Sequence, residues 1–309
     1  MEKPRSKFID GALQIISGGS AGFIEVCFMH PLDLIKTRIQ IQSNKTSIIL
    51  PNGNDSKYRY NGIIDCLIKI SKYEGISSFY KGILPPLMAE TPKRAIKFFT
   101  FQQYKNLFLF GSENPTPLTY SLAGACSGIT EAVFVNPFEV VKIYLQSNKS
   151  KSKEVPSAWH VTKEIYKSNG FGLNGLNKGL SGTIARNGIF NMVYFGFYHS
   201  VKDILPKNNG KIENFLAHLL IGFTSGSLAS CVNIPFDVAK SRIQAPQNDG
   251  KYKKLIPTMQ IIAREEGWRA LYKGLLPKIM RLGPGGAIML IIYDYSYEFL
   301  KNFLNVMQQ

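Results

Sequence analysis

The segments HPLDLIKTRIQIQ (residues 30–42), NPFEVVKIYLQSN (136–148) and IPFDVAKSRIQAP (234–246) decide the fold of this chain. Each has a proline at its second position, an acid two residues later and a lysine three residues after the acid. The copies stand about a third of the 309-residue chain apart. A motif that recurs at a regular interval indicates a repeated structural unit, so the chain is predicted to consist of three homologous repeats.

Two further markers occur in the same order in every third. A GxxxG motif precedes each proline segment, at residues 18–22, 124–128 and 222–226. A stretch that ends in Lys-Gly follows it: YEGISSFYKG (73–82), NGFGLNGLNKG (169–179) and EEGWRALYKG (265–274). The markers predict an N-terminal tail over residues 1–10 and repeats over residues 11–108, 117–205 and 213–301.

Each repeat is predicted to hold two long helices around a shorter one. Residues 214–236 contain no Asp, Glu, Lys or Arg, and 23 residues suffice to cross a hydrocarbon core of ~30 Å. The other long segments lie near 11–32, 83–105, 118–138, 180–202 and 275–298, with short amphipathic stretches at 60–74, 157–168 and 254–266. The fold class is therefore an all-α membrane protein with six transmembrane helices in three pseudo-threefold repeats. The alternative is a soluble α-solenoid, whose repeats of roughly 20–45 residues are much shorter.

The composition excludes several classes of protein. With 45% apolar residues the chain is not disordered, and its four cysteines lack the spacing of a disulfide scaffold. The net charge of +16 leaves nucleic acid, an anionic membrane surface or acidic small molecules as partners. Nucleic acid is not expected, because the basic residues are spread over the chain and do not form one patch. No metal-ligand spacing, catalytic triad or phosphate-binding loop occurs, so we expect neither metal nor cofactor, and no enzyme activity.

The proline segments predict a gate. Acid and lysine three residues apart share a helix face, so a local ion pair is one alternative. Around a threefold axis, each acid could instead pair with the lysine of a neighbouring repeat and close a ring. Each proline would act as a hinge that bends its helix inward, and a glutamine one turn beyond the lysine could brace the ring. The gate residues are Asp33, Lys36, Glu139, Lys142, Asp237 and Lys240, the glutamines Gln40, Gln146 and Gln244, and the hinges Pro31, Pro137 and Pro235.

A substrate site is predicted on the second helix of each repeat. Counting seven residues from the marker glycines aligns Ala89 with Arg186 and Arg281, which lie in the middle of their spans. Charges at that depth normally face a watery path, and two arginines suit a substrate with two carboxylates. The remaining predicted substrate residues are Lys93, Lys97, Asn187 and Glu90. The alternative is that both arginines pair with Glu25 and Glu131 and bind nothing; Arg94 is expected at a helix end or an interface.

A second, weaker gate is predicted at the other end of the bundle. The positions nineteen residues and more after the marker glycines hold Gln102 with Lys105, His199 with Lys202, and Asp294. This is an aromatic-acid-x-x-base pattern in which only Asp294 keeps the acid. Few ion pairs can therefore form there.

Three Pro-x-acid-x-x-Lys motifs, each followed by a Lys-Gly marker, resemble the mitochondrial carrier family over nearly the whole chain. The middle marker departs from the pattern, because it is longer and lacks the acid and the tyrosine. The resemblance implies a multi-pass protein of the mitochondrial inner membrane with both termini toward the intermembrane space and the short helices toward the matrix. It also implies a monomer that works by alternating access, with membrane lipid such as cardiolipin as a partner.

The pair Arg186-Asn187 resembles that of keto-acid carriers in this family, and AETPKRAIKFFTFQQYK (89–105) is similar to carriers of 2-oxodicarboxylates. The expected activity is exchange of 2-oxoadipate, 2-oxoglutarate and similar C5–C7 dicarboxylates. Two alternatives stay open. One is a carrier for citrate, malate or an acidic amino acid, and the other is a proton-leak protein that uses Glu25, Glu131 and the arginines as a relay.

Overall fold

The computed structural model describes residues 7–42, 59–150, 155–202, 211–246 and 250–307, and this part of the chain is helical without strands. The long helices are α1 (Lys7–Ile41), α3 (Leu84–Leu107), α4 (Pro117–Ser147), α6 (Leu180–Lys202), α7 (Lys211–Gln244) and α9 (Leu275–Met307). The short ones are α2 (Ile63–Tyr73), α5 (Ala158–Asn169) and α8 (Leu255–Glu266), with 3-10 turns η2 (Ile76–Tyr80) and η5 (Trp268–Tyr272). Helix α1 begins inside the expected tail, whose residues 1–6 lie outside the described part, as do the last residues of the expected second repeat.

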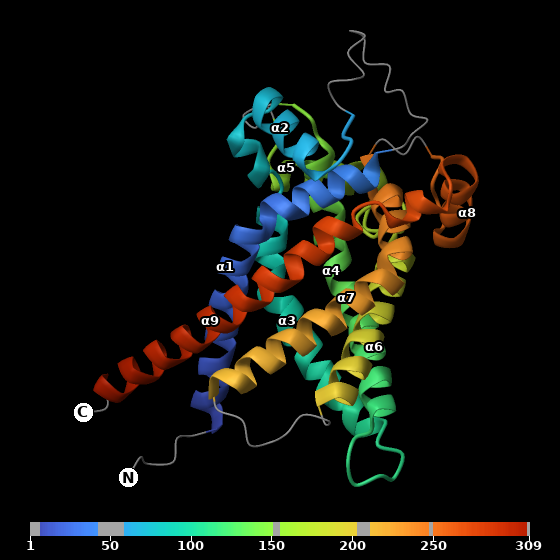
Figure 1. The fold of residues 1–309 in the computed structure, drawn as a ribbon. Helices are drawn as coiled ribbons and strands as arrows, with labels where there is room; N and C mark the ends of the chain where they lie inside the picture. Colours follow the sequence, from blue (N-terminus) through green and yellow to red (C-terminus); the bar gives the residue numbers. More distant parts are fainter. Residues whose placement is uncertain (1–6, 43–58, 151–154, 203–210, 247–249, 308–309) are drawn as a thin grey trace.

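The three repeats form one bundle. Each contributes a long, a short and a long helix, and Figure 1 shows α2, α5 and α8 at one end of the bundle. Helix α1 begins and α9 ends at the other end (Figure 1). Helices α1 and α9 pack together, as do α3 with α4 and α6 with α7. These contacts join each repeat to the next, and the pairing of the first helix with the last closes the circle.

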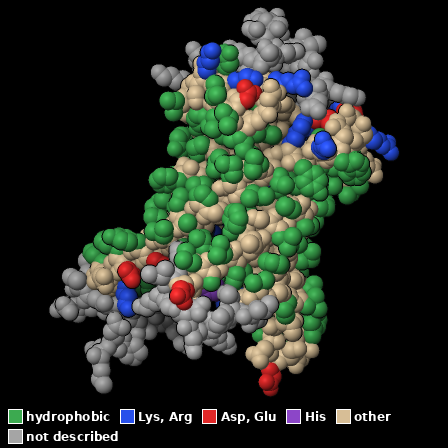
Figure 2. Space-filling model, viewed as in Figure 1, with side chains coloured by type: hydrophobic (Ala, Val, Ile, Leu, Met, Phe, Trp, Pro, Cys, Tyr) green, Lys and Arg blue, Asp and Glu red, His purple; other side chains and the backbone are tan. Residues whose placement is uncertain are grey.

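The long helices present an apolar belt. Hydrophobic side chains cover the middle of the face seen in Figure 2, and most charged side chains gather toward the two ends. Three described segments are long and apolar enough to cross a membrane: Pro117–Ser147, Leu216–Gln244 and Trp268–Phe303. Helix α3 is not among them, because its interior carries Glu90, Lys93, Arg94 and Lys97. Glu90, Lys93 and Arg94 make ion pairs in the interior of the bundle.

The proline positions lie inside continuous helices. Helices α1, α4 and α7 run through Pro31, Pro137 and Pro235. A proline inside a helix removes one hydrogen bond and crowds the preceding turn, which favours a bend. Figure 1 shows α1 changing direction in the half that lies nearer α2. The role of these prolines as hinges stays a prediction.

The GxxxG glycines allow close helix packing in the second repeat. A Cβ atom at Gly128 would lie 2.5 Å from the carbonyl oxygen of Asn187, and one at Gly124 would lie 2.7 Å from that of Asn191. Both acceptors are on α6, so α4 and α6 approach backbone to backbone. Small residues at this spacing are the usual means of such an approach in membranes.

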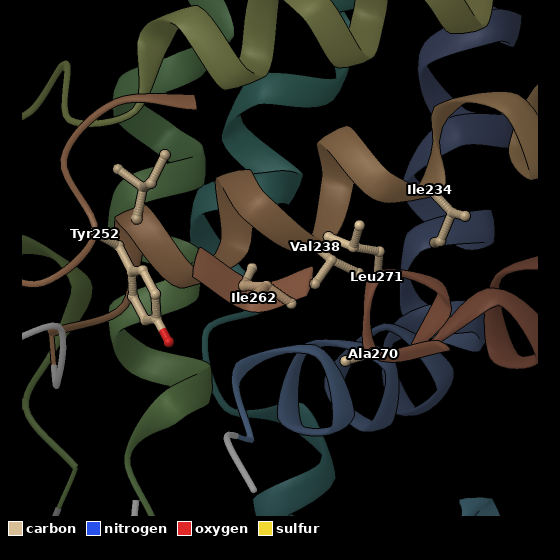
Figure 3. Packing of buried hydrophobic residues seen from close by; sticks show 7 residues of the cluster. Ile234, Val238, Tyr252, Ile262, Ala270 and Leu271 are labelled. Atoms are coloured by element: carbon tan, nitrogen blue, oxygen red, sulfur yellow. The ribbon is translucent and has the colours of Figure 1, made fainter. Parts of the chain in front are cut away.

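Each short helix is held to the end of a long helix by an apolar cluster. In the third repeat, Ile234 and Val238 of α7 pack against Ile262 of α8 and Leu271 of η5 (Figure 3). Tyr252 and Ala270 complete the cluster that Figure 3 labels. The first repeat has an equivalent cluster and so does the second. Apolar residues of the amphipathic stretches 60–74, 157–168 and 254–266 therefore pack in these clusters.

The marker glycines occupy a backbone conformation that other residues rarely adopt. Gly274 has φ +83° and its missing Cβ would lie 2.9 Å from Cγ of Gln40, in the first repeat. Gly82 faces Gln146 and Gly179 faces Gln244 in the same way. Each marker glycine thus meets the glutamine of the following repeat around the circle.

We expect Gly274→Ala to destabilise the protein more than Gly267→Ala. Gly267 has φ +84° and ψ 163° but no atom within 4 Å of its missing Cβ, so its substitution adds only the backbone cost of ~1–3 kcal/mol. At Gly274 the new methyl also overpacks Gln40, which adds ~1–3 kcal/mol. Thermal unfolding of both variants in detergent measures the difference. Equal melting temperatures would show that the contact with Gln40 is not tight.

Candidate substrate site and ion-pair ring

The acids and lysines of the proline segments form a ring between repeats. Each acid pairs with the lysine of the following repeat, not with the lysine of its own segment. The pairs are Asp33–Lys142 at 2.8 Å, Asp237–Lys36 at 2.6 Å and Glu139–Lys240. Gln40 donates to Asp237 at 3.3 Å and so contacts the ring directly. This ion-pair ring closes the end of the bundle that carries α2, α5 and α8.

The other two glutamines do not reach a ring acid. Gln146 accepts a hydrogen bond from Thr37 at 2.7 Å, and Gln244 donates to Asn136 at 2.9 Å. The expectation that the glutamine amides brace the ring therefore holds for Gln40 and is wrong for the other two, whose hydrogen bonds go to Thr37 and to Asn136 and Lys178 O. These bonds still join neighbouring repeats, so the glutamines tie the bundle together beside the ring.

The two aligned arginines lie directly against the ion-pair ring. Arg281 of α9 pairs with Asp33 at 2.9 Å and with Glu25 at 3.1 Å. Arg186 of α6 pairs with Glu139 at 2.6 Å and donates to Asn187 Oδ1 at 2.9 Å. Arg186 also lies 3.7 Å from Asp237, so each of the three ring acids contacts both a ring lysine and an arginine.

The alternative in which both arginines are neutralised by Glu25 and Glu131 holds for one of them only. Arg281 does pair with Glu25. Glu131 is buried and accepts a hydrogen bond from Asn187 at 3.2 Å, while Arg186 turns to Glu139. The guanidinium groups therefore contact the ring, which the sequence pattern did not reveal.

Helix α3 contributes the remaining predicted cations. The ammonium of Lys93 lies 3.8 Å from the Glu90 carboxylate. Lys97 lies over the ring of Phe195, 5.4 Å from its centroid, and no described carboxylate is within ion-pair distance of it. Lys97 thus adds a positive charge to the interior without a direct ion pair among the described residues.

Arg94 was expected at a helix end or an interface, and the structure contradicts that expectation. Its guanidinium faces the interior, pairs with Glu90 at 2.6 Å and with Glu25 at 2.9 Å, and is only 17% exposed. Arg94 follows Lys93 directly, so its Cα lies about 100° further round helix α3. The arginine side chain is long enough to reach the interior from there. Its partner Glu25 is on α1, 69 residues away in the chain, so local spacing gave no signal.

Lys278 is a further cation of the site that the sequence alignment missed. It contacts Asp237 at 3.4 Å and Asn233, and it lies 5.6 Å from the centroid of the Phe190 ring. Lys278 is three residues before Arg281 on α9, and residues three apart share a helix face. That spacing is the signal that could have found it.

The residues of the second predicted gate are not brought together. Gln102, Lys202 and Asp294 are exposed, and Lys105 and His199 are half-buried. His199 stacks on Tyr120 with ring centroids 3.5 Å apart. Within the described ranges, no ion pair joins Lys105, Lys202 and Asp294 to one another, in contrast to the ring of ion pairs at the end with the short helices.

Buried ion clusters lie beside the ring in the first and third repeats. In the third, Arg242 and Lys273 both pair with Glu266, whose side chain is fully buried. In the first repeat Arg38 and Lys81 pair with Glu74 in the same way. The second repeat has Tyr144, Asn169 and Lys178 at these positions and keeps only the lysine. Arg242 also donates to Gln40 O at 3.1 Å, so the cluster joins the third repeat to the first.

Glu266 gives the protein a pH-dependent contribution to stability. Burial raises the pKa of its carboxyl, but hydrogen bonds from Arg242 and Lys273 outweigh burial and lower that pKa to about 2 from 4.5. A group whose folded pKa is lowered stabilises the fold above its unfolded pKa, and this stabilisation disappears as the pH falls toward the folded value. We expect the gap in melting temperature between the native chain and Glu266→Gln to be full above about pH 5 and to shrink below it.

Melting temperatures between pH 7 and pH 3 test this expectation. Glu265→Gln is the control, because Glu265 is the neighbouring acid and its carboxylate is 29% exposed. A gap for Glu266→Gln that stayed constant down to pH 3 would show that Glu266 does not carry the effect.

Within the described residues, no cluster of His, Cys, Asp or Glu could hold a metal ion. The interior instead holds cations and carboxylates on six long helices, suited to binding a small anion. A family model described as mitochondrial carrier protein matches residues 10–112, 113–209 and 211–304. The chain belongs to the mitochondrial carrier family, whose members are multi-pass membrane transporters.

Curated relatives are similar over almost the full length. The mitochondrial 2-oxodicarboxylate carrier of Homo sapiens is 52% identical over 97% of this chain and 98% of its own. The mitochondrial 2-oxodicarboxylate carrier 2 of Saccharomyces cerevisiae is 40% identical over 94% of each chain. A probable mitochondrial 2-oxodicarboxylate carrier of Dictyostelium discoideum is 38% identical over 93% of this chain and 90% of its own.

Proposed function

We propose that this protein exchanges 2-oxodicarboxylates, such as 2-oxoglutarate and 2-oxoadipate, across the mitochondrial inner membrane. The observation that carries the proposal is the pair Arg186 and Arg281, which come from different repeats and lie beside the same ion-pair ring. A guanidinium holds a carboxylate through two parallel hydrogen bonds, so two of them suit a dianion. The names of relatives that are 38–52% identical support the same substrate class.

The shared ring acids suggest how binding is coupled to movement. When a substrate carboxylate binds Arg281 or Arg186, that arginine turns away from Asp33 or Glu139. Each acid then keeps a single lysine, and the ring becomes easier to open. The substrate therefore supplies the free energy that opening requires, because a ligand shifts an equilibrium by its preference for one state. The substrate site then returns to its first orientation with a counter-substrate bound, so each cycle exchanges one substrate for another.

The orientation follows from the same proposal. The end with α2, α5, α8 and the closed ring faces the matrix, and the chain termini face the intermembrane space. A monomer is sufficient, since one bundle contains all the predicted site residues. The net charge of +16 favours contact with anionic membrane lipid, of which cardiolipin is our expected example.

The test is uptake of labelled 2-oxoglutarate into liposomes that contain the purified protein, with and without internal 2-oxoadipate. We expect uptake that requires the internal partner. Uptake without it would indicate a uniporter, and competition by citrate, malate or an acidic amino acid alone would indicate another substrate. Proton conductance without dicarboxylate transport would favour the proton-leak alternative. Protein that is folded but takes up no dicarboxylate would overturn the proposal.

A further inference from the structure

Glu25 of α1 is held by two arginines from two other helices. Its Oε2 lies 2.9 Å from Arg94 of α3, and its Oε1 lies 3.1 Å from Arg281 of α9. Among the described carboxylates, Glu25 is the one whose two oxygens are divided between two arginines; the ring acids each include a lysine. The arrangement is a seat for one carboxylate between two guanidinium groups, currently taken by the protein itself.

The surroundings fix Arg94 in this seat. A Cβ atom at Gly22 would lie 2.8 Å from Arg94 Nε, so the glycine leaves room for the guanidinium to lie against α1. Glu90 accepts from the same Nε at 2.6 Å, and Met289 of α9 lies against Nη1. A guanidinium that is already positioned loses little conformational freedom when it binds a ligand, which favours tight binding.

Glu25 is also placed so that another carboxylate can replace it. Its side chain is 15% exposed, and within the described residues its ion pairs are with Arg94 and Arg281. Gly285 of α9 faces it, since a Cβ there would lie 3.4 Å from Glu25 Oε1. Lys97, one turn beyond Arg94's neighbour Lys93, has no described carboxylate within ion-pair distance, so the site has positive charge for an additional anion.

We infer that Arg94 is a third arginine of the substrate site, and that Glu25 occupies the seat between Arg94 and Arg281 until a substrate carboxylate takes its place. This inference rests on the proposed function and extends it. One carboxylate of the 2-oxodicarboxylate binds between Arg94 and Arg281, and the other binds Arg186. Arg94 is then a specificity residue for the carboxylate that binds beside Arg281, and Glu25 competes with that carboxylate for the two arginines.

The two residues have opposite expected effects. Arg94→Ala removes a charge-assisted contact to the substrate, so the KM for 2-oxoglutarate rises at least about tenfold. Arg94→Lys keeps the charge without the planar fork and gives an intermediate KM. Glu25→Gln removes the competing charge and lowers the KM, roughly two- to fivefold, because a neutral amide holds the arginines less strongly. Arg264→Ala, which removes an exposed arginine of α8, leaves the KM unchanged.

The experiment measures initial rates of 2-oxoglutarate exchange in liposomes at several external concentrations for these variants. The rise in melting temperature caused by 2-oxoglutarate is measured beside it, since a ligand that binds the folded state stabilises it. We expect this rise to be smaller in Arg94→Ala and larger in Glu25→Gln than in the native chain. The melting temperature without ligand shows whether each variant folds.

The outcomes separate this inference from the proposed function. If the native chain transports no 2-oxodicarboxylate, the proposed function fails. If it does, and folded Arg94→Ala or Arg94→Lys keeps the native KM, Arg94 is only a counter-ion of Glu25 and Glu90, and the inference is overturned. If Glu25→Gln raises the KM, Glu25 helps to hold the substrate site in place and does not compete with the substrate.

Discussion

Arg186→Ala and Arg281→Ala are each expected to reduce 2-oxoglutarate exchange at least about 30-fold. Either change removes a guanidinium from the proposed substrate and also from a ring acid, Glu139 or Asp33. Truncating one member of a close charge pair in a poorly solvated site costs ~2–5 kcal/mol, which corresponds to roughly 30-fold to several thousand-fold in binding. The measurement is the initial rate of exchange in liposomes that hold equal amounts of folded protein.

The matched control for this prediction is Arg269→Ala, which removes an exposed arginine of η5 outside the proposed site. Arg186→Lys and Arg281→Lys are measured beside it and should retain part of the rate, because an ammonium keeps the charge but not the bidentate geometry. Exchange that continues at the native rate in either alanine variant would remove that arginine from the site.

Arg242→Ala is expected to lower the free energy of unfolding by ~3 kcal/mol, because the buried Glu266 carboxylate loses the arginine that holds both of its oxygens, although it keeps its ion pair with Lys273. Arg242 and Glu266 are both almost completely buried, and the arginine also donates to backbone carbonyls of Gln40 and Gln42. The variant therefore loses an ion pair within the third repeat and hydrogen bonds to the first. Thermal unfolding in detergent measures the loss.

The second repeat lacks the buried arginine and glutamate, so a double variant that removes both is a useful comparison for Arg242→Ala. This repeat has a tyrosine at Tyr144 and an amide at Asn169 where the other repeats have the arginine and the glutamate, so the fold tolerates the absence of both. We expect Arg242→Tyr combined with Glu266→Asn to be more stable than Arg242→Ala alone, since the buried carboxylate is removed together with the arginine, and Lys273 is left as Lys178 is in the second repeat, where it donates to a backbone carbonyl. A double variant less stable than Arg242→Ala would contradict this explanation.

The positions of the helices follow closely from sequence pattern. The segment without charges at 214–236 lies within α7, and the short amphipathic stretches correspond to α2, α5 and α8. Apolar runs, helix-breaking residues and amphipathic spacing act over a few turns, so a single segment contains the information. The marker glycines carry similar local information, because their positive φ angles restrict which residue can stand there.

The partners within the site depend on contacts that no local pattern contains. The spacing in Pro-x-acid-x-x-Lys allows a pair within one segment, yet Asp33 pairs with Lys142, 109 residues away. Arg281 and Asp33 are 248 residues apart. The prediction of Arg94 at a helix end or an interface was wrong for the same reason: its carboxylate partner Glu25 comes from another helix.

The sequence by itself determined the number of repeats, the class of fold, the order of the helices and the types of residue at the ring and in the substrate site. Only the tertiary structure decided that each ring acid pairs with the next repeat, that Gln146 and Gln244 contact Thr37 and Asn136, and that Lys278 and Arg94 face the interior. The physical reason is one of range. Helix formation depends on neighbours in the chain, whereas charged side chains take whichever partner the packing of distant helices brings within reach.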